Sequence, residues 1–262
     1  MPSSRSSREV RKRRDSCRRI GLLTKRSLKE ILRDPLSLIF TLGLPLVMEI
    51  LFWLIFHGMT SQFEMKYLAP GIVVFSQSFL TLFVGILLAT DRSTSFLTRL
   101  FVSRARPFEF IFGYTLSILP LVLIQSVLFF IVGTAFEPSI FGIGILRAVL
   151  LSLVTSLFFI AAGLLLGTLC TEKSIGGVAS ILIAGQSVLS GMWFPVEGLS
   201  SGMLTAMKIL PFRNATLLIQ NALNGWSDGF GDILLPLLIV IAYAVAVFII
   251  AILIFRSKMR SD

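Results

Sequence analysis

Apolar residues in this chain form long continuous runs, separated by short segments that carry the polar and charged positions. Six runs reach or approach the ~20 residues that a helix needs to cross the hydrocarbon core of a bilayer. The runs do not alternate with a period of two, so they predict helices rather than the strands of a barrel. The predicted spans, of which the fifth is the least apolar, cover residues 36–57, 69–90, 110–136, 143–170, 175–194 and 233–255.

The segment before the first span has the pattern of an amphipathic helix. Residues 18–34 place apolar side chains close to one helical face and basic side chains around the rest, and Asp34-Pro35 ends the helix because a residue before proline leaves the α region. A helix of this kind lies on the inner leaflet of a membrane. Residues 1–17, rich in Ser and Arg, predict a disordered basic tail. The apolar positions of the helix are Ile20, Leu23, Leu28, Ile31 and Leu32.

Two connecting segments are more apolar than solvated linkers need to be. Residues 91–109 carry four arginines together with Phe96, Leu97 and Leu100, which predicts a short helix resting on the membrane or on a partner protein. Residues 195–232 are apolar between Met203 and Leu223 and are interrupted by proline and glycine. Half-helices that dip into the outer leaflet satisfy both properties, because broken backbone is tolerated there when it is packed in protein.

Composition and charge agree with a membrane protein and fix an orientation. The chain is 55 % hydrophobic and 15 % charged, with a mean hydropathy of +0.88, which leaves too few polar residues for the surface of a soluble domain of this length. Half of its 24 Lys and Arg residues precede residue 36. Basic residues favour the cytoplasmic side, so both termini are predicted to be cytoplasmic in a multi-pass protein of the cell membrane. The basic residues then left outside are Lys66, Arg147, Lys208 and Arg213.

The basic N-terminal segment could also suggest a nucleic-acid-binding protein or a signal peptide, but the sequence favours neither. No nucleic-acid-binding module follows this segment, so no nucleic-acid partner is predicted, and the length of the basic and apolar regions excludes a cleavable signal peptide. Cys17 and Cys170 both fall on the cytoplasmic side, where thiols stay reduced.

Two common motifs for catalysis are absent from the sequence. It has no phosphate-binding loop of the form G-x-x-x-x-G-K-[ST] and no H-E-x-x-H, and His57 is its single histidine. The chain is therefore predicted to be no enzyme, with no catalytic residue, cofactor or metal site. Any ATP hydrolysis would be on a partner subunit.

Glu49 is the one acidic residue deep within a predicted span. A charge at bilayer depth costs about 3 kcal/mol or more, so such a residue faces a cavity or a partner, or is protonated. One interpretation is a polar lining of a substrate pathway or a proton site. The other is a neutral acid that is hydrogen-bonded to a neighbouring helix, with Gln77, Gln125 and Gln186 as intramembrane polar partners or further pathway residues.

Small residues cluster in the fourth span, where Gly163 and Gly167 form a small-xxx-small pattern. Such a pattern lets two helices approach closely. Packing within one chain is the preferred interpretation over a seam between two chains.

Four places resemble the permease subunits of type-2 ABC exporters, which export drugs, lipids and polysaccharides. The basic helix ends in Arg33-Asp34-Pro35, and Tyr67-Leu68-Ala69-Pro70-Gly71 opens the second span. The segment from Asp91-Arg92 to Arg104-Ala105-Arg106-Pro107, followed by Gly113, resembles the coupling segment of the family. Ser190-Gly191-Met192-Trp193-Phe194-Pro195 and Leu210-Pro211-Phe212 resemble its signature near span five. Asp91-Arg92-Ser93-Thr94 and Leu199-Ser200 depart from the family pattern.

This resemblance implies an all-α fold with six transmembrane helices, the interfacial helix at 18–34, re-entrant extracytoplasmic half-helices between spans five and six, and a permease domain at 35–262. It implies a homo- or heterodimer with a second permease chain, bound to separate ABC ATPase subunits and surrounded by membrane lipids. The substrate itself is not specified. The candidates for coupling to the ATPases are Arg33, Asp91, Arg92, Arg99, Arg104 and Arg106.

Three alternatives remain open at this point. A membrane scaffold or immunity protein would share the bundle without transporting anything. A lipid-modifying intramembrane enzyme would need clustered His, Asp or Glu near one membrane face, which the sequence lacks. A secondary transporter would move protons through Glu49, although no internal repeat is detectable.

Overall fold

The computed structural model describes residues 4–93, 107–193, 199–225 and 230–261, and throughout these ranges the secondary structure is helical. Five helices are long and apolar enough to cross a membrane: Pro35–Phe56, Met65–Ser93, Pro107–Phe136, Ile143–Leu169 and a stretch from Gly231 to Lys258. The helices are α1 (Ser4–Leu32), α2 (Pro35–Phe56), α3 (Met65–Ser93), α5 (Pro107–Phe136), α6 (Ile143–Leu169), α7 (Glu172–Leu189), α8 (Ser201–Ile209), α9 (Pro211–Asn224) and α10 (Leu235–Ser261). The described ranges also contain short 3-10 turns at Ser61–Phe63 and Pro138–Ile140 and a π-helical turn at Phe230–Leu234.

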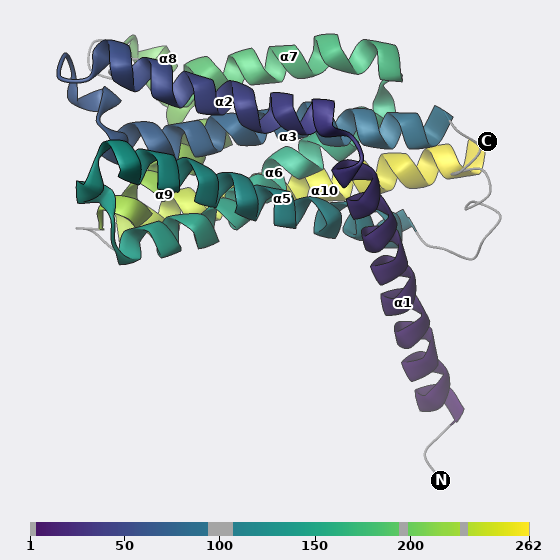
Figure 1. The fold of residues 1–262 in the computed structure, drawn as a ribbon. Coiled ribbons are helices and arrows are strands. Elements are labelled where there is room, and N and C mark those ends of the chain that lie inside the picture. Colours follow the sequence, from purple (N-terminus) through teal and green to yellow (C-terminus); the bar gives the residue numbers. More distant parts are fainter. Residues whose placement is uncertain (1–3, 94–106, 194–198, 226–229, 262) are drawn as a thin grey trace.

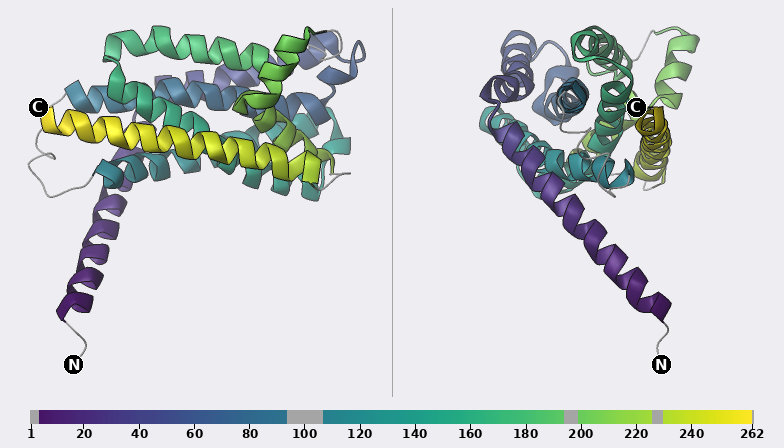
Figure 2. Two further views of the ribbon diagram at one scale, coloured as in Figure 1. Left: turned by 180° about the vertical axis from the view of Figure 1, so that it is seen from behind. Right: turned by 90° about the vertical axis from the view of Figure 1, so that its right-hand side faces the viewer.

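The long helices lie side by side in one bundle, and α1 leaves this bundle at an angle (Figures 1 and 2). The chain turns sharply between α1 and α2, where Asp34 caps α2 by accepting a hydrogen bond from the Ser37 amide (3.1 Å) and Pro35 fixes the first helical position. This confirms that Asp34-Pro35 ends the amphipathic helix. The C-terminus lies at the same end of the bundle as the junction between α1 and α2 (Figure 1).

The first seventeen residues differ from the sequence prediction. A disordered tail was predicted for residues 1–17, but α1 begins at Ser4 and runs without a break to Leu32. Arg and Lys have high helix propensity, so a segment rich in them can extend a helix that later residues hold in place.

Each predicted span coincides with a helix, but the structure does not establish six crossings. The segment 175–194 corresponds to α7, which has 18 residues and is not among the five helices whose length and apolarity suffice for a span. It nevertheless packs lengthwise along α3 (Figure 1).

The direction of the helices requires α7 to lead the chain back along the bundle. The C-terminal ends of α6 and α10 lie together, because the Lys258 ammonium donates to the Thr168 carbonyl (2.8 Å). Helix α6 therefore runs in the same direction as α10. The chain must return between them, and α7 covers most of that distance (Figure 2).

Two short helices occupy the segment in which half-helices were predicted. Helices α8 and α9 are separated by Leu210, which is extended and precedes Pro211. Helix α9 packs against α3, α6 and α10 and buries Leu218, Ile219 and Ala222. Its C-terminal end is tied to the start of α3, since Gln220 donates to the Tyr67 carbonyl (3.1 Å) and Asn224 to the Lys66 carbonyl (2.9 Å).

Helix α3 forms the centre of the bundle and packs most closely against α6. In its most apolar stretch 78 % of the residues are buried, against 17 % in α2. A Cβ atom on Gly163 would lie 2.8 Å from the Thr81 carbonyl oxygen, and one on Gly167 would lie 2.7 Å from the Gly85 carbonyl oxygen. The small-xxx-small pattern therefore serves packing within the chain, as the sequence indicated.

We expect Gly163→Ala and Gly167→Ala each to destabilise the bundle by about 1–3 kcal/mol, because the added methyl group meets backbone atoms that cannot move aside cheaply. Thermal unfolding of the purified protein in detergent measures the effect. Gly202→Ala in α8 is the matched control, since a Cβ atom there meets nothing within 4 Å. Equal unfolding temperatures for all three variants would contradict the close packing of α3 and α6.

Candidate functional site

A buried carboxylate joins α1 to the ends of two long helices. Asp91, near the end of α3, is 2 % exposed. Its two oxygens accept hydrogen bonds from the Arg26 guanidinium at 2.6 and 3.0 Å, and one of them also accepts the hydroxyl proton of Tyr114 on α5. A bidentate pair of this kind fixes orientation as well as distance. Arg26 therefore holds α1 across the ends of α3 and α5.

A second buried carboxylate fixes the preceding turns of α1. Glu109, in the first turn of α5, is 2 % exposed; it pairs with Arg19 at 3.5 Å and accepts a hydrogen bond from the Ser16 hydroxyl. Between the two carboxylates the helices come very close, since a Cβ atom on Gly113 would lie 2.9 Å from that of Leu23. The α1–α5 contact therefore needs glycine at position 113.

These contacts lie on both flanks of the predicted coupling segment. Asp91 lies just before residues 94–106 and Glu109 just after them. Arg99, Arg104 and Arg106, which the sequence proposed as coupling residues, lie outside the described residues. Asp91 itself was proposed as a coupling residue, and the structure places it inside the protein, bound to α1.

Arg92, the next coupling candidate, binds the C-terminal end of α6. Its guanidinium donates to the Gly167 carbonyl at 2.8 Å and also reaches the carbonyls of Thr168 and Cys170. A cation at these carbonyls satisfies groups that lack partners within the helix and complements the helix dipole. Together with Lys258, Arg92 ties the ends of α3, α6 and α10 to one another.

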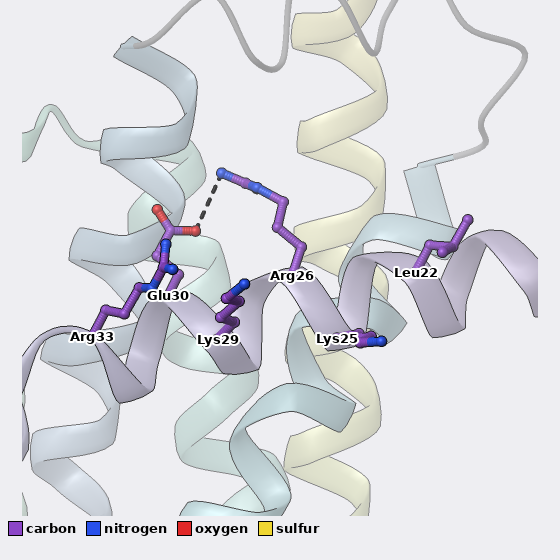
Figure 3. Close-up of a pocket in the computed structure, with 6 residues that line it drawn as sticks. All are labelled: Leu22, Lys25, Arg26, Lys29, Glu30 and Arg33. Carbon is purple, nitrogen blue, oxygen red and sulfur yellow. Dashed lines mark ion pairs between the residues drawn. The ribbon is translucent and has the colours of Figure 1, made fainter.

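Arg33 is exposed and directly follows α1. It lines a pocket of about 510 Å³ together with Leu22 and four polar residues of α1 (Figure 3). Within this pocket Arg26 also pairs with Glu30 at 3.2 Å. Partial burial and the nearby Asp91 carboxylate raise the pKa of Glu30, and Arg26 offsets part of this rise. The four polar residues are Lys25, Arg26, Lys29 and Glu30.

Glu49 is fully buried on α2, and neither of its oxygens has a hydrogen-bond partner in the described part of the chain. One oxygen lies 3.6 Å from where a Cβ atom of Gly133 on α5 would be, and the same position contacts Ala69 of α3. Glycine at 133 therefore leaves the space that the carboxyl group occupies. The hydrogen bond to a neighbouring helix that the sequence suggested for Glu49 is not present in this structure.

The three glutamines separate into two kinds. Gln77 is satisfied by α6, because it donates to the Ser152 carbonyl (2.9 Å) and accepts the Thr155 hydroxyl proton (2.9 Å). Gln125 and Gln186 are fully buried, and their side-chain amides have no partner among the described residues. None of the three binds Glu49. Gln77 has a structural role, whereas Gln125 and Gln186 stand with Glu49 as unsatisfied polar groups inside the bundle.

At the end of α2 that lies away from α1, a further acid ties three helices together. Glu137 accepts hydrogen bonds from the Trp53 indole (3.0 Å) and the Met65 amide (3.1 Å), and it lies 3.8 Å from His57. Trp53 and His57 follow Glu49 at intervals of four residues, so all three lie on one face of α2. Glu137 was not predicted as a functional residue from the sequence.

Three further site residues were not predicted from the sequence: Arg26, Glu109 and Tyr114. Arg26 is one of twelve basic residues near the N-terminus, and no spacing distinguishes it from its neighbours. The sequence around Glu109 does indicate the start of a helix, since an acidic residue in the first turn after Pro107 is favourable there. It does not indicate that Glu109 contacts α1.

Comparison with known protein families matches residues 18–224 to the ABC-2 type transporter family. A search among curated proteins finds no significant match. The family match covers most of the chain, from the carboxylate-binding part of α1 through α9, and includes Arg26, Glu49, Asp91 and Glu109. The chain therefore belongs to the ABC-2 type transporter family, whose members are membrane permeases of ABC transporters.

Proposed function

We propose that this chain is the transmembrane permease subunit of an ATP-driven exporter, which works as a dimer with a second permease chain and with separate ATPase subunits. The ATPases bind at the end of the bundle that carries residues 94–106 and α1. Nucleotide-driven closure of the ATPases then shifts the permease between two states that open to opposite sides of the membrane.

The observation that carries this proposal is the fixation of α1 to both flanks of residues 94–106. Asp91 and Glu109 bind Arg26 and Arg19 of the same helix, so force applied to this segment is transmitted to α1, α3 and α5 together. Arg92 extends the connection to α6 and α10. A segment whose flanks are tied to five helices is suited to couple a bound ATPase to the bundle.

The proposal includes six crossings with both termini in the cytoplasm. Its support is the return of the chain along α7 and the distribution of basic residues, which places all but Lys66, Arg147, Lys208 and Arg213 inside. Helices α8 and α9 then form re-entrant half-helices on the extracytoplasmic side.

Cysteine labelling tests this topology. In a chain with Cys17 and Cys170 replaced by serine, we expect Gly202→Cys to react with a membrane-impermeant maleimide in intact cells, because Gly202 is exposed beyond the outer end of α7. Lys173→Cys, at the opposite end of α7, should react only after the cells are made permeable. Reaction of both positions from one side would exclude a crossing by α7.

A dimer is supported by the outward face of α7. Gly177, Ser180 and Ala184 are exposed at intervals of three and four residues, and a Cβ atom on Gly177 would meet nothing within 4 Å. In a membrane such small residues allow a second helix to approach closely. A second permease chain, identical or homologous, is the partner proposed for this face.

Coupling is tested by breaking the Arg26–Asp91 pair. Arg26→Gln leaves a buried carboxylate without its cation, which costs on the order of 2 kcal/mol and releases α1. In vesicles that contain the permease with its ATPase, we expect export to fall at least tenfold while ATP hydrolysis continues. Arg99→Glu should act in the same way if residues 94–106 contact the ATPase.

Two controls make this test decisive. The double variant Arg26→Gln with Asp91→Asn removes both charges and should recover much of the lost export. Lys173→Glu changes an exposed charge at the same end of the bundle and should leave coupling intact. Unchanged export by Arg26→Gln and Arg99→Glu would contradict the proposed contact, and an ATPase that never binds the permease would favour the scaffold.

We further propose that Glu49 lines the substrate pathway, with Gln125 and Gln186 as additional polar groups. A buried polar atom without a partner costs about 1–3 kcal/mol, so its presence needs a compensating role. The support is that Glu49 belongs to α2, the helix that is only 17 % buried in its most apolar stretch. A small movement of α2 would expose the carboxyl group.

We expect Glu49→Met to raise the free energy of unfolding by about 1–3 kcal/mol, because a thioether of similar volume leaves no unsatisfied oxygen. Thermal unfolding in detergent measures this. Export by the same variant should fall, which is the usual outcome when a destabilising but functional group is removed. Gln77→Met is the control and should destabilise, since it breaks two hydrogen bonds. Full export by Glu49→Met would show that the carboxyl group is dispensable.

A further inference from the structure

An apolar groove of about 610 Å³ runs between α1 and α5, on the opposite side of α1 from the Arg26–Asp91 pair. One residue of α5, Leu116, forms its far wall, and the remaining residues come from successive turns of α1. Leu116 is 43 % exposed and Phe112, one turn earlier, is 53 % exposed. The residues that α1 contributes are Cys17, Ile20, Gly21, Thr24, Lys25 and Leu28.

The groove opens toward the lipid rather than toward the cytoplasm. Leu116 follows Gly113 along α5, so it lies deeper in the proposed membrane than the point where α1 touches that helix. Exposed leucine and phenylalanine at this depth face acyl chains. The walls of the groove therefore continue the lipid-facing surface of α5.

Lys25 stands at the boundary between this groove and the basic pocket. It lines both, and Lys29 and Arg33 line the pocket next to it (Figure 3). Arg19 and Arg26 are paired with carboxylates, whereas within the described residues Lys25, Lys29 and Arg33 form no ion pair. An apolar groove that ends at uncompensated cations is complementary to a molecule with an apolar chain and an anionic head.

We propose that this groove binds an anionic phospholipid of the inner leaflet, with an acyl chain against Leu116 and Leu28 and the headgroup phosphate between Lys25 and Lys29. The orientation of the site rests on the proposed function, which places this end of the bundle in the cytoplasm. An acidic surface of the ATPase could satisfy the lysines, but it could not fill an apolar groove that faces lipid.

The bound lipid acts on the same helix that couples the ATPase. The bundle-facing side of α1 is held by Asp91 and Glu109, and the lipid would hold its opposite, membrane-facing side. An anionic lipid therefore stabilises the docked position of α1, and its loss leaves the two ion pairs as the main attachments of the helix.

The native Cys17, which is exposed in the groove, provides a probe. The full-length permease, with Cys170 replaced by serine, is labelled at Cys17 with a small fluorophore and placed in nanodiscs. Each nanodisc contains phosphatidylcholine and phosphatidylglycerol, and only one of the two lipids carries brominated acyl chains that quench the fluorophore. We expect brominated phosphatidylglycerol to quench more strongly than brominated phosphatidylcholine at equal mole fraction.

Substitutions assign the preference to the lysines. Each cation near an anionic surface contributes about 1 kcal/mol, so Lys25→Gln and Lys29→Gln should each reduce the preference for phosphatidylglycerol roughly fivefold. Lys173→Gln, an exposed lysine at the same end of the bundle, should leave it unchanged. Native mass spectrometry of the unlabelled permease, comparing retained phosphatidylglycerol across the same variants, repeats the test without a fluorophore in the groove.

Each other outcome overturns the proposal. Equal quenching by both lipids means that the groove does not select a headgroup, and absence of quenching means that no acyl chain occupies it. If Lys173→Gln loses as much preference for phosphatidylglycerol as Lys25→Gln and Lys29→Gln do, the preference comes from the overall charge of the protein and not from this groove. Weakened ATPase binding by Lys25→Gln without any change in lipid preference assigns the basic surface to the ATPase. No ATPase or transport is needed to detect lipid binding, so its failure is distinguishable from failure of the proposed export function.

Discussion

The carboxylate of Asp91 is a charge that the protein buries, and a buried charge requires a partner. Arg26 supplies that partner from a different helix, and Tyr114 supplies a further hydrogen bond from a third. Helix α1 must therefore lie across the ends of α3 and α5 for the charge to be compensated. The positions of the two flanks of residues 94–106, of the basic pocket and of the apolar groove all follow from this single requirement.

Much of the bundle could be predicted because a lipid environment leaves few alternatives. Continuous apolar runs must become helices, so the segments around Glu49, Gln77 and Gln125 were located to within a few residues. Asp34-Pro35 marked a helix boundary for a local steric reason. The glycine pair at 163 and 167 indicated close packing, and the structure adds that α3 is the helix it meets.

The remaining features depend on contacts between distant residues, which a single sequence does not display. Arg26 and Asp91 are 65 positions apart, and Arg92 binds a carbonyl 75 positions away. From the resemblance, Asp91 and Arg92 were predicted to contact a partner ATPase at the protein surface. In the structure both instead bind other helices of the same chain. Gly71 and Met192, from two separate motifs, touch in the structure: a Cβ atom on Gly71 would lie 3.1 Å from that of Met192.

The short connection between α1 and α2 has a mechanical consequence. Only Arg33 and Asp34 separate the two helices, and Asp34 is hydrogen-bonded to the first turn of α2. A movement of α1 is therefore transmitted directly to the adjoining end of α2. Helix α2 is held at its far end through Trp53 and Glu137 but is little buried along its length. Rotation of α1 relative to the bundle would therefore move the end of α2 that adjoins α1, while the end held by Glu137 stays in place.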